Sequence, residues 1–223
     1  MNSSVPNFYL GIGYLEGVLE TRIRPWQVWL RLRAWLSLAD SPCNSDLIFV
    51  LAGGMDRKEY ALELFRQGAA PRILLSVGRF EIRRFSKMPL PVALDLLKMA
   101  QAVPPPKRHY FVDFQADVVG VEYVRPGRLG TLTEINALAR WLSARLQVRS
   151  VLVVSNATHL RRIRICCHSI LCPDLEMTFV PAPNLSPESP QEAPHGSLRN
   201  DLLELFKLCG YWFFLRTRGH RIF

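Results

Sequence analysis

Short apolar segments alternate along this chain with longer segments of helical period. The clearest apolar runs are Asp46–Leu51 and Ser150–Ser155, and each is followed by a helical pattern. Strands that are apolar on both sides are typical of parallel sheets with helices on both faces. The sequence therefore predicts an α/β fold, a three-layer Rossmann-like domain with a mostly parallel sheet. Strands are expected at 46–51, 72–76, 109–114, 121–124 (a short strand or an edge), 150–155 and 177–180, and helices at 57–67, 91–102, 131–146, 158–168 and 198–216.

The 223 residues are enough for one domain with an extension. We expect an N-terminal helical extension at 1–40 and the α/β domain at 41–223. That domain includes a mobile, proline-rich linker at 181–197. Within the extension, Leu15, Val18 and Leu19 share a helical face, and 26–38 is amphipathic, which favours packing on the core over a membrane-surface helix. No run has the roughly 20 apolar residues of a membrane span, so a cytoplasmic protein is expected, with membrane association left open.

The formal net charge is +9, from 28 Lys and Arg against 19 Asp and Glu. A positive field attracts anionic partners: a phosphorylated metabolite, a membrane surface or nucleic acid. We expect an anionic small molecule and do not favour nucleic acid, while peripheral membrane contact stays open. The five cysteines include no C-x-x-C pair. Cys166 and Cys167 are expected to pack in the core, because adjacent helical residues point about 100° apart and do not easily share a metal ion.

Three predicted strands end in small or polar residues. They are followed by Gly53–Gly54, Ser76–Gly78 and Ser155–Asn156. Ligands of open parallel sheets bind at the carboxyl ends of the strands, where helix N-termini favour anions. Glycine at such a turn lets backbone N–H groups approach a ligand closely. Gly53, Gly54, Ser76, Gly78, Ser155 and Asn156 are therefore predicted to bind ligand, although ordinary βα turns would leave the same pattern.

Side chains near these turns supply candidates for chemistry. His159 lies in the first turn of the helix after the 150–155 strand, and Arg162 follows three positions later on the same face. Together they can clamp a phosphate, or His159 can transfer a proton. Thr131 and Glu134 form a T-x-x-E pattern that favours a capping box. Because that helix start points at the same edge, Glu134 is also a candidate acid, base or ligand contact.

Several common site motifs are absent from the sequence. It has no G-x-x-x-x-G-K-[ST] loop, no G-x-G-x-x-G fingerprint and no G-x-S-x-G elbow. These absences argue against P-loop NTPases, common dinucleotide dehydrogenases and typical α/β-hydrolases.

Four motifs in order carry a family resemblance: an apolar strand ending in Gly53–Gly54 with Arg57 after it, then "ALELFRQGAAPRILLSVG", "GTLTEINALARWL" and "VRSVLVVSNATHLRRIRI". Over 46–168 this order resembles the SanA/ElyC/YdcF-like family, a domain of unknown function. The closing "LLELFKLCGYWFFLRTRG" is similar as well. The sequence departs from the pattern at Val77, Ile163 and Ala157–Thr158, and in "GTLTEI".

The resemblance implies a Rossmann-like fold and links to envelope integrity and lipid-carrier metabolism. It also implies S-adenosylmethionine as a candidate cofactor, since one branch is reported to bind it. By motif, it places Gly53, Gly54, Arg57, Ser76, Gly78, Thr131, Glu134, Ser155, His159 and Arg162 in the pocket. Three functions are expected as alternatives: phosphate-centred hydrolysis or transfer with His159 and Glu134 as catalytic residues, a non-catalytic S-adenosylmethionine or nucleotide sensor, and a peripheral membrane protein.

Overall fold

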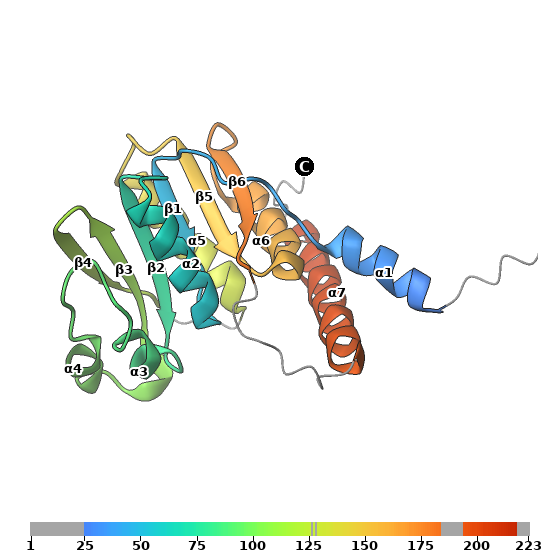
Figure 1. Cartoon of the computed structure of the whole chain (residues 1–223), viewed down its shortest axis with the longest axis horizontal. Coiled ribbons are helices and arrows are strands. Elements are labelled where there is room, and N and C mark those ends of the chain that lie inside the picture. Colours follow the sequence, from blue (N-terminus) through green and yellow to red (C-terminus); the bar gives the residue numbers. More distant parts are fainter. Residues whose placement is uncertain (1–24, 126, 128, 184–193, 218–223) are drawn as a thin grey trace, which may run out of the picture.

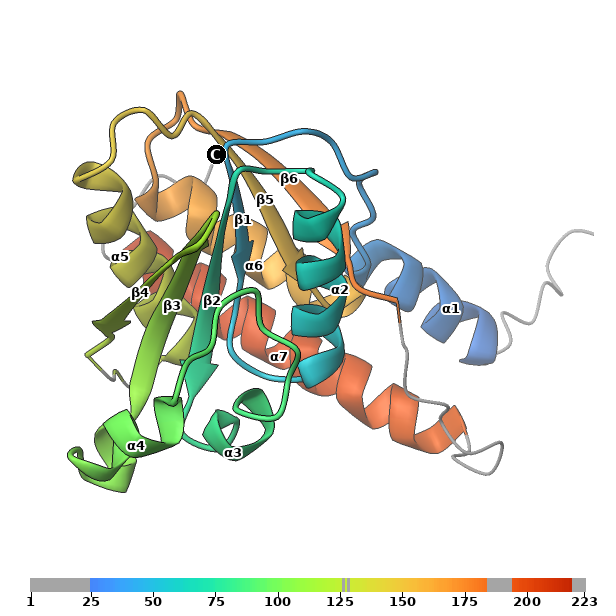
Figure 2. The same ribbon diagram turned by 60° about the vertical axis from the view of Figure 1, so that its left-hand side comes forward.

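The computed structural model describes residues 25–125, 127, 129–183 and 194–217. They form one six-stranded mixed sheet with helices on both faces (Figures 1 and 2). The α/β, Rossmann-like class with a mostly parallel sheet is thus confirmed. The strand order is β4-β3-β2-β1-β5-β6, with β1 Leu47–Val50, β2 Arg72–Gly78, β3 His109–Gln115, β4 Val118–Tyr123, β5 Ser150–Ser155 and β6 Glu176–Pro181.

Alternate residues of the buried strands face two separate cores. Ile48 and Val50 pack on the side of α2, α3 and α4, whereas Leu47 and Phe49 pack on the side of α5, α6 and α7. Burial on both faces explains why β1 has no polar residue. The helices are α1 Pro25–Leu36, α2 Met55–Arg66, α3 Ile82–Phe85, α4 Leu96–Gln101, α5 Gly130–Ser143, α6 Ala157–Ile170 and α7 Pro194–Thr217, with a 3-10 turn at Pro105–Lys107.

The sheet reverses its direction of growth between β1 and β5. From β1 the chain moves outward to β2, and from β5 it moves the opposite way to β6. All four strands are parallel, and β1 pairs directly with β2 and with β5. The carboxyl ends of β1 and β5 therefore flank a topological switch point, the usual position of a ligand crevice in open α/β sheets.

The third strand runs against its neighbour, unlike the central strands. β3 pairs antiparallel with β2, and His109 lies opposite Gly78 in the register. The connection from β2 holds only α3, α4 and the 3-10 turn, which lie toward the carboxyl end of β2 (Figure 2). The chain therefore enters β3 from that end. As a result His109 lies next to the edge at which β1, β2 and β5 finish.

Three helices differ from the sequence expectation by three or more residues at one end. The helix expected at 91–102 is shorter, because the Asp95 carboxylate caps α4 by accepting from Lys98 N at 2.9 Å. The helix expected at 131–146 ends at Ser143, so Leu146 lies beyond it and is 84% exposed. The closing helix α7 begins at Pro194, four residues before the expected start.

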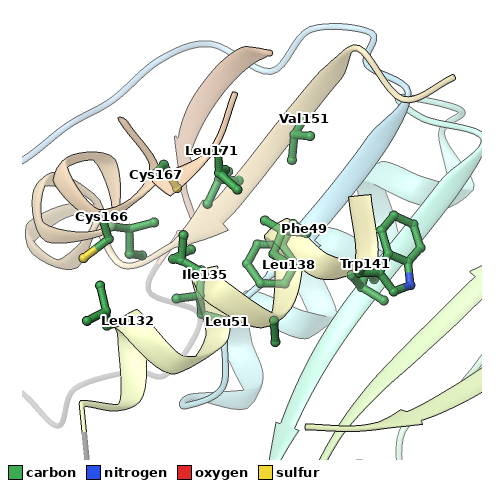
Figure 3. Packing of buried hydrophobic residues seen from close by; sticks show 14 of the residues in the cluster. Phe49, Leu51, Leu132, Ile135, Leu138, Trp141, Val151, Cys166, Cys167 and Leu171 are labelled. Atoms are coloured by element: carbon green, nitrogen blue, oxygen red, sulfur yellow. The ribbon is translucent and has the colours of Figure 1, made fainter. Parts of the chain in front are cut away.

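The core between α5, α6 and the sheet contains both adjacent cysteines (Figure 3). Cys166 and Cys167 are fully buried among residues such as Leu132 and Leu171, which confirms that they pack in the core. Burial raises the pKa of the Cys166 thiol to about 12. Both thiols are therefore protonated at neutral pH and unreactive.

The extension is described only from Pro25 onward, so the expected helical face at Leu15, Val18 and Leu19 lies outside the described residues. The linker residues 184–193 lie outside them as well. Helix α1 reaches the domain through Leu36, which is buried, and through Trp29 Nε1, which donates to Asp201 at 3.0 Å. None of the described helices has the length and apolarity needed to cross a bilayer.

Candidate functional site

Side chains from both sides of the switch point meet at the carboxyl edge. Arg57, in the first turn of α2 after β1, donates from Nη1 to Ser155 Oγ at the end of β5, at 3.1 Å. The same nitrogen donates to Ala52 O at 3.2 Å. Ser155 Oγ also lies 3.1 Å from His159 Nδ1. Arg57 and Ser155 thus join the two halves of the sheet, and His159 lies next to the Ser155 hydroxyl.

The start of α5 also contacts this group, from the face of the sheet that carries α6 and is opposite to α2. Thr131 Oγ1 lies 3.4 Å from His159 Nε2 and accepts from Arg162 Nη1 at 2.7 Å. Arg162 also pairs with Glu204 of α7 at 3.1 Å, and its guanidinium stacks on Tyr211. The predicted capping role of Thr131 is wrong, because α5 starts one residue earlier and its N-cap is Leu129.

Glu134 lies beneath this group and is almost fully buried. Its Oε1 accepts from Ala52 N at 2.7 Å and from the Ser76 hydroxyl. Ser76 Oγ in turn lies 2.7 Å from His109 Nε2, which is 3.6 Å from the Glu134 carboxylate. Glu134 makes no capping bond, so the capping box favoured by its pattern is wrong for this residue too. Its carboxylate connects β1, β2 and β3 at their shared edge.

Glu81 forms a clamp between the first two βα turns. Its Oε1 accepts from Gly53 N at 2.7 Å, and its Oε2 accepts from Gly78 N at 2.9 Å. The same carboxylate pairs with Lys58 Nζ at 2.6 Å, and Lys58 is completely buried. These two N–H groups already have an acceptor within the protein. The binding of an external anion by Gly53 and Gly78 stays a prediction, and it would require Glu81 to give up these bonds.

The turn after β1 requires glycine at position 53 because of the backbone conformation and the space that Arg57 occupies. Its φ is +138°, a conformation that side chains rarely adopt, and a Cβ at this position would collide with the Arg57 guanidinium. The glycine thus lets Arg57 lie flat against the backbone of the turn. Gly54 and Asn156 are the exposed N-cap residues of α2 and α6, and neither helix has a side-chain capping bond.

Arg57 and His159 both have lowered pKa values. The pKa of Arg57 is lowered mainly by burial, although the carboxylates of Glu81 and Glu134 act against this effect. The pKa of His159 lies well below its ordinary value because of burial, with further lowering by Arg162, Arg57 and Lys207. His159 is therefore neutral at pH 7 and can accept a proton.

The predicted side chains Arg57, Thr131, Ser155, His159 and Arg162 thus come together at one edge, with Ser76 and Glu134 beneath them. Sequence reasoning missed Lys58, Glu81, His109 and Glu204. Glu81 follows the second strand-end turn by three residues, a signal that was present. No sequence signal indicates His109, because its place at the site depends on the direction of β3. Glu204 has no such signal either, because it lies far from the other site residues along the chain.

No three His, Cys, Asp or Glu side chains in the described part of the chain are placed to share a metal ion. The donors at the edge are instead guanidinium groups, hydroxyls and a neutral imidazole. This set suits an anionic oxygen-rich group better than a cation.

No protein-family model, curated protein or solved structure matches the chain.

Proposed function

We propose that this protein binds an anionic small molecule, phosphorylated or nucleotide-like, at the switch point between β1 and β5. One observation carries the proposal. Arg57 is buried there, yet its hydrogen bonds go to the neutral oxygens of Ala52 and Ser155, and its Nε has no hydrogen-bond partner among the described residues. Among the described residues, no carboxylate lies within 4.0 Å of this guanidinium. A buried charge without a close counter-ion is costly, and an incoming anion would supply the missing partner.

Further groups at the edge support an anion of phosphate type. Arg162 reaches the same hydroxyl, Thr131 Oγ1, that faces His159. Two guanidinium groups on either side of a phosphate can neutralise the charge that develops during transfer to water or to another hydroxyl. His159, held neutral, would take the proton of the attacking oxygen. The set thus supports phosphate-centred hydrolysis or transfer.

Glu134 has a different role in this proposal. Its Oε1 is occupied by Ala52 N and the Ser76 hydroxyl, so we assign it to positioning the end of β1 rather than to proton transfer. The order of the four motifs around these residues also leads us to propose membership of the SanA/ElyC/YdcF-like family. Envelope or lipid-carrier metabolism would then be the setting of the reaction.

Thermal-shift and calorimetric titrations of the full chain test binding. The probes are inorganic phosphate, nucleoside phosphates, a sugar phosphate and S-adenosylmethionine. Arg57→Lys and Arg57→Met are compared with Arg83→Gln, which removes an exposed cation of α3. We expect at least one phosphorylated probe to bind the wild type and Arg83→Gln equally. Arg57→Met should bind it roughly 10- to 100-fold more weakly, as expected when one charge-assisted contact is lost.

Failure of every probe to bind, or equal binding by Arg57→Met, would contradict the proposal. Tight binding of S-adenosylmethionine alone would support the sensor alternative. Turnover of the bound phosphorylated probe, measured with His159→Ala, separates an enzyme from a sensor. Turnover that is unchanged in His159→Ala would remove the proton-transfer role of His159.

A further inference from the structure

The outer face of α7 is as apolar as its inner face. Leu208, Tyr211 and Leu215 are buried against the domain. On the opposite side a continuous stripe of exposed apolar residues follows the helical period: Leu202, Leu203, Phe206 and Phe213, with Phe206 79% and Phe213 66% exposed. A helix that is apolar all round is normally buried on all sides. The outer face of α7 therefore suits a second apolar environment.

Helix α1 adds a second exposed apolar surface beside it. Trp26 and Trp35 are each about half exposed, and Val28 and Leu30 are similarly open. The two helices touch through the bond from Trp29 to Asp201. Both lie on the side of the molecule away from β3 and β4 (Figure 1). Including Trp212, three exposed tryptophans belong to this pair of helices, which we call the α1/α7 face.

The exposed charges of the α1/α7 face have one sign. Arg31, Arg199, Lys207 and Arg216 are exposed cations on the two helices. The two acidic residues of α7 are turned inward. Asp201 is buried against Trp29, and Glu204 pairs with Arg162 and Lys207. The described part of α1 contains no acidic residue.

We propose that the α1/α7 face docks on an anionic lipid bilayer. Tryptophan and phenylalanine lie at the boundary between head groups and acyl chains, and Arg and Lys bind anionic lipids beside them. A second copy of the chain is a poorer occupant, because a symmetric contact of this face would bring together cations of both copies, and the described residues of α1 and α7 offer no exposed carboxylate to pair with them. This inference is independent of the anion site.

Flotation of the full chain with vesicles tests the proposal. Phosphatidylcholine vesicles with and without about 30% phosphatidylglycerol are compared, since anionic head groups should draw the basic helices. The double variant Phe206→Ser/Phe213→Ser removes apolar area from the face. Leu146→Ser removes an equally exposed leucine (84%) between α5 and β5, and serves as the matched control.

We expect the wild type and Leu146→Ser to float with anionic vesicles, and less so at high salt. The double variant should show about a tenfold smaller bound fraction, because it lacks the two exposed aromatic rings that would enter the bilayer. Arg199→Gln/Arg216→Gln should weaken binding through charge alone. Absence of flotation by the wild type, or equal flotation by all variants, would overturn the proposal. Analytical sedimentation without vesicles provides a second test. A wild type that is a dimer and a double variant that is a monomer would show that the face binds a second copy of the chain, and this would also overturn the proposal.

Discussion

His159 is a neutral histidine that lies between two buried arginines, Arg57 and Arg162. His159 lies within hydrogen-bond range of the hydroxyls of Ser155 and Thr131, and each hydroxyl is bound by one arginine. Protonated His159 would place a third cation between Arg57 and Arg162. The arrangement therefore keeps the imidazole neutral, and the anion that we propose to bind here would make a proton on His159 more favourable.

The low pKa of His159 predicts a loss of stability in mild acid. Below pH 6.5 the unfolded chain takes up a proton at this residue, whereas the native protein does not. The contribution of neutral His159 to the free energy of unfolding is therefore present above pH 6.5. It is lost as the pH falls from 6.5 toward the pKa of His159 in the native protein. We expect His159→Gln to remove about 1 kcal/mol of the decrease in unfolding free energy between about pH 7.5 and 5.5.

Urea unfolding at the two pH values measures this effect. His168→Gln is the matched control on the same helix, because His168 is exposed and should account for less of the decrease. A His159→Gln variant with the pH dependence of the wild type would show that His159 titrates normally in the native protein.

Glu134 tests the distinction between positioning and proton transfer. Replacement by Ala leaves Ala52 N and the Ser76 hydroxyl without their acceptor in a buried place. We expect Glu134→Ala to lose about 3 kcal/mol of unfolding free energy, since each unsatisfied buried group costs about 1–3 kcal/mol. Glu134→Gln retains an acceptor oxygen and should lose clearly less. Equal losses in chemical denaturation would contradict the acceptor role.

At the scale of elements, the turns after β1 and β2 are held together by one ion pair. Lys58 extends from α2 and reaches Glu81 just ahead of α3, and Glu81 in turn fixes the backbone of both turns. Burial lowers the pKa of Lys58, and the contact with Glu81 opposes this shift. The pair thus sets the distance between two strand ends that border the site.

Breaking this pair from one side should be costly. Glu81→Ala leaves a buried Lys58 without its partner and two turn N–H groups without their acceptor. We expect a loss of about 3–5 kcal/mol in unfolding free energy. Adding Lys58→Met to Glu81→Ala should recover part of it, because the unpaired charge is removed. A double-mutant cycle measures the coupling, and strictly additive losses would contradict the clamp.

Over the whole molecule, stability is expected to be highest along the two strands at the switch point. Every residue of β1 is buried, and Leu152, Val153 and Val154 of β5 are fully buried. The edge strand β4 is open on one side, with Val118 69% exposed. Native-state hydrogen exchange should therefore be slowest in β1 and β5 and fastest in β4 and α4. Faster exchange in β1 than in β4 would contradict this order.

Several features were determined by local sequence. The bounds of β5, the buried cysteines of α6 and the helix stop at Gly68, with its φ of +80°, follow from composition and turn chemistry within a few residues. The gathering of Gly53, Ser76, Thr131 and His159 at one edge was also predicted. For Gly53, Ser76 and His159 it needs only that β1, β2 and β5 run in the same direction. Thr131 joins them because it follows β4, which runs in the same direction as β2.

Tertiary structure decided what each of these residues contacts. Thr131 and Glu134 carry a capping pattern, yet the packing of α5 against the sheet turns them toward Arg162 and Ala52. His109 reaches Ser76 only because β3 runs antiparallel, and Glu204 reaches Arg162 only because α7 packs on α6. Such contacts join residues far apart in the chain, and no local pattern encodes their free energy.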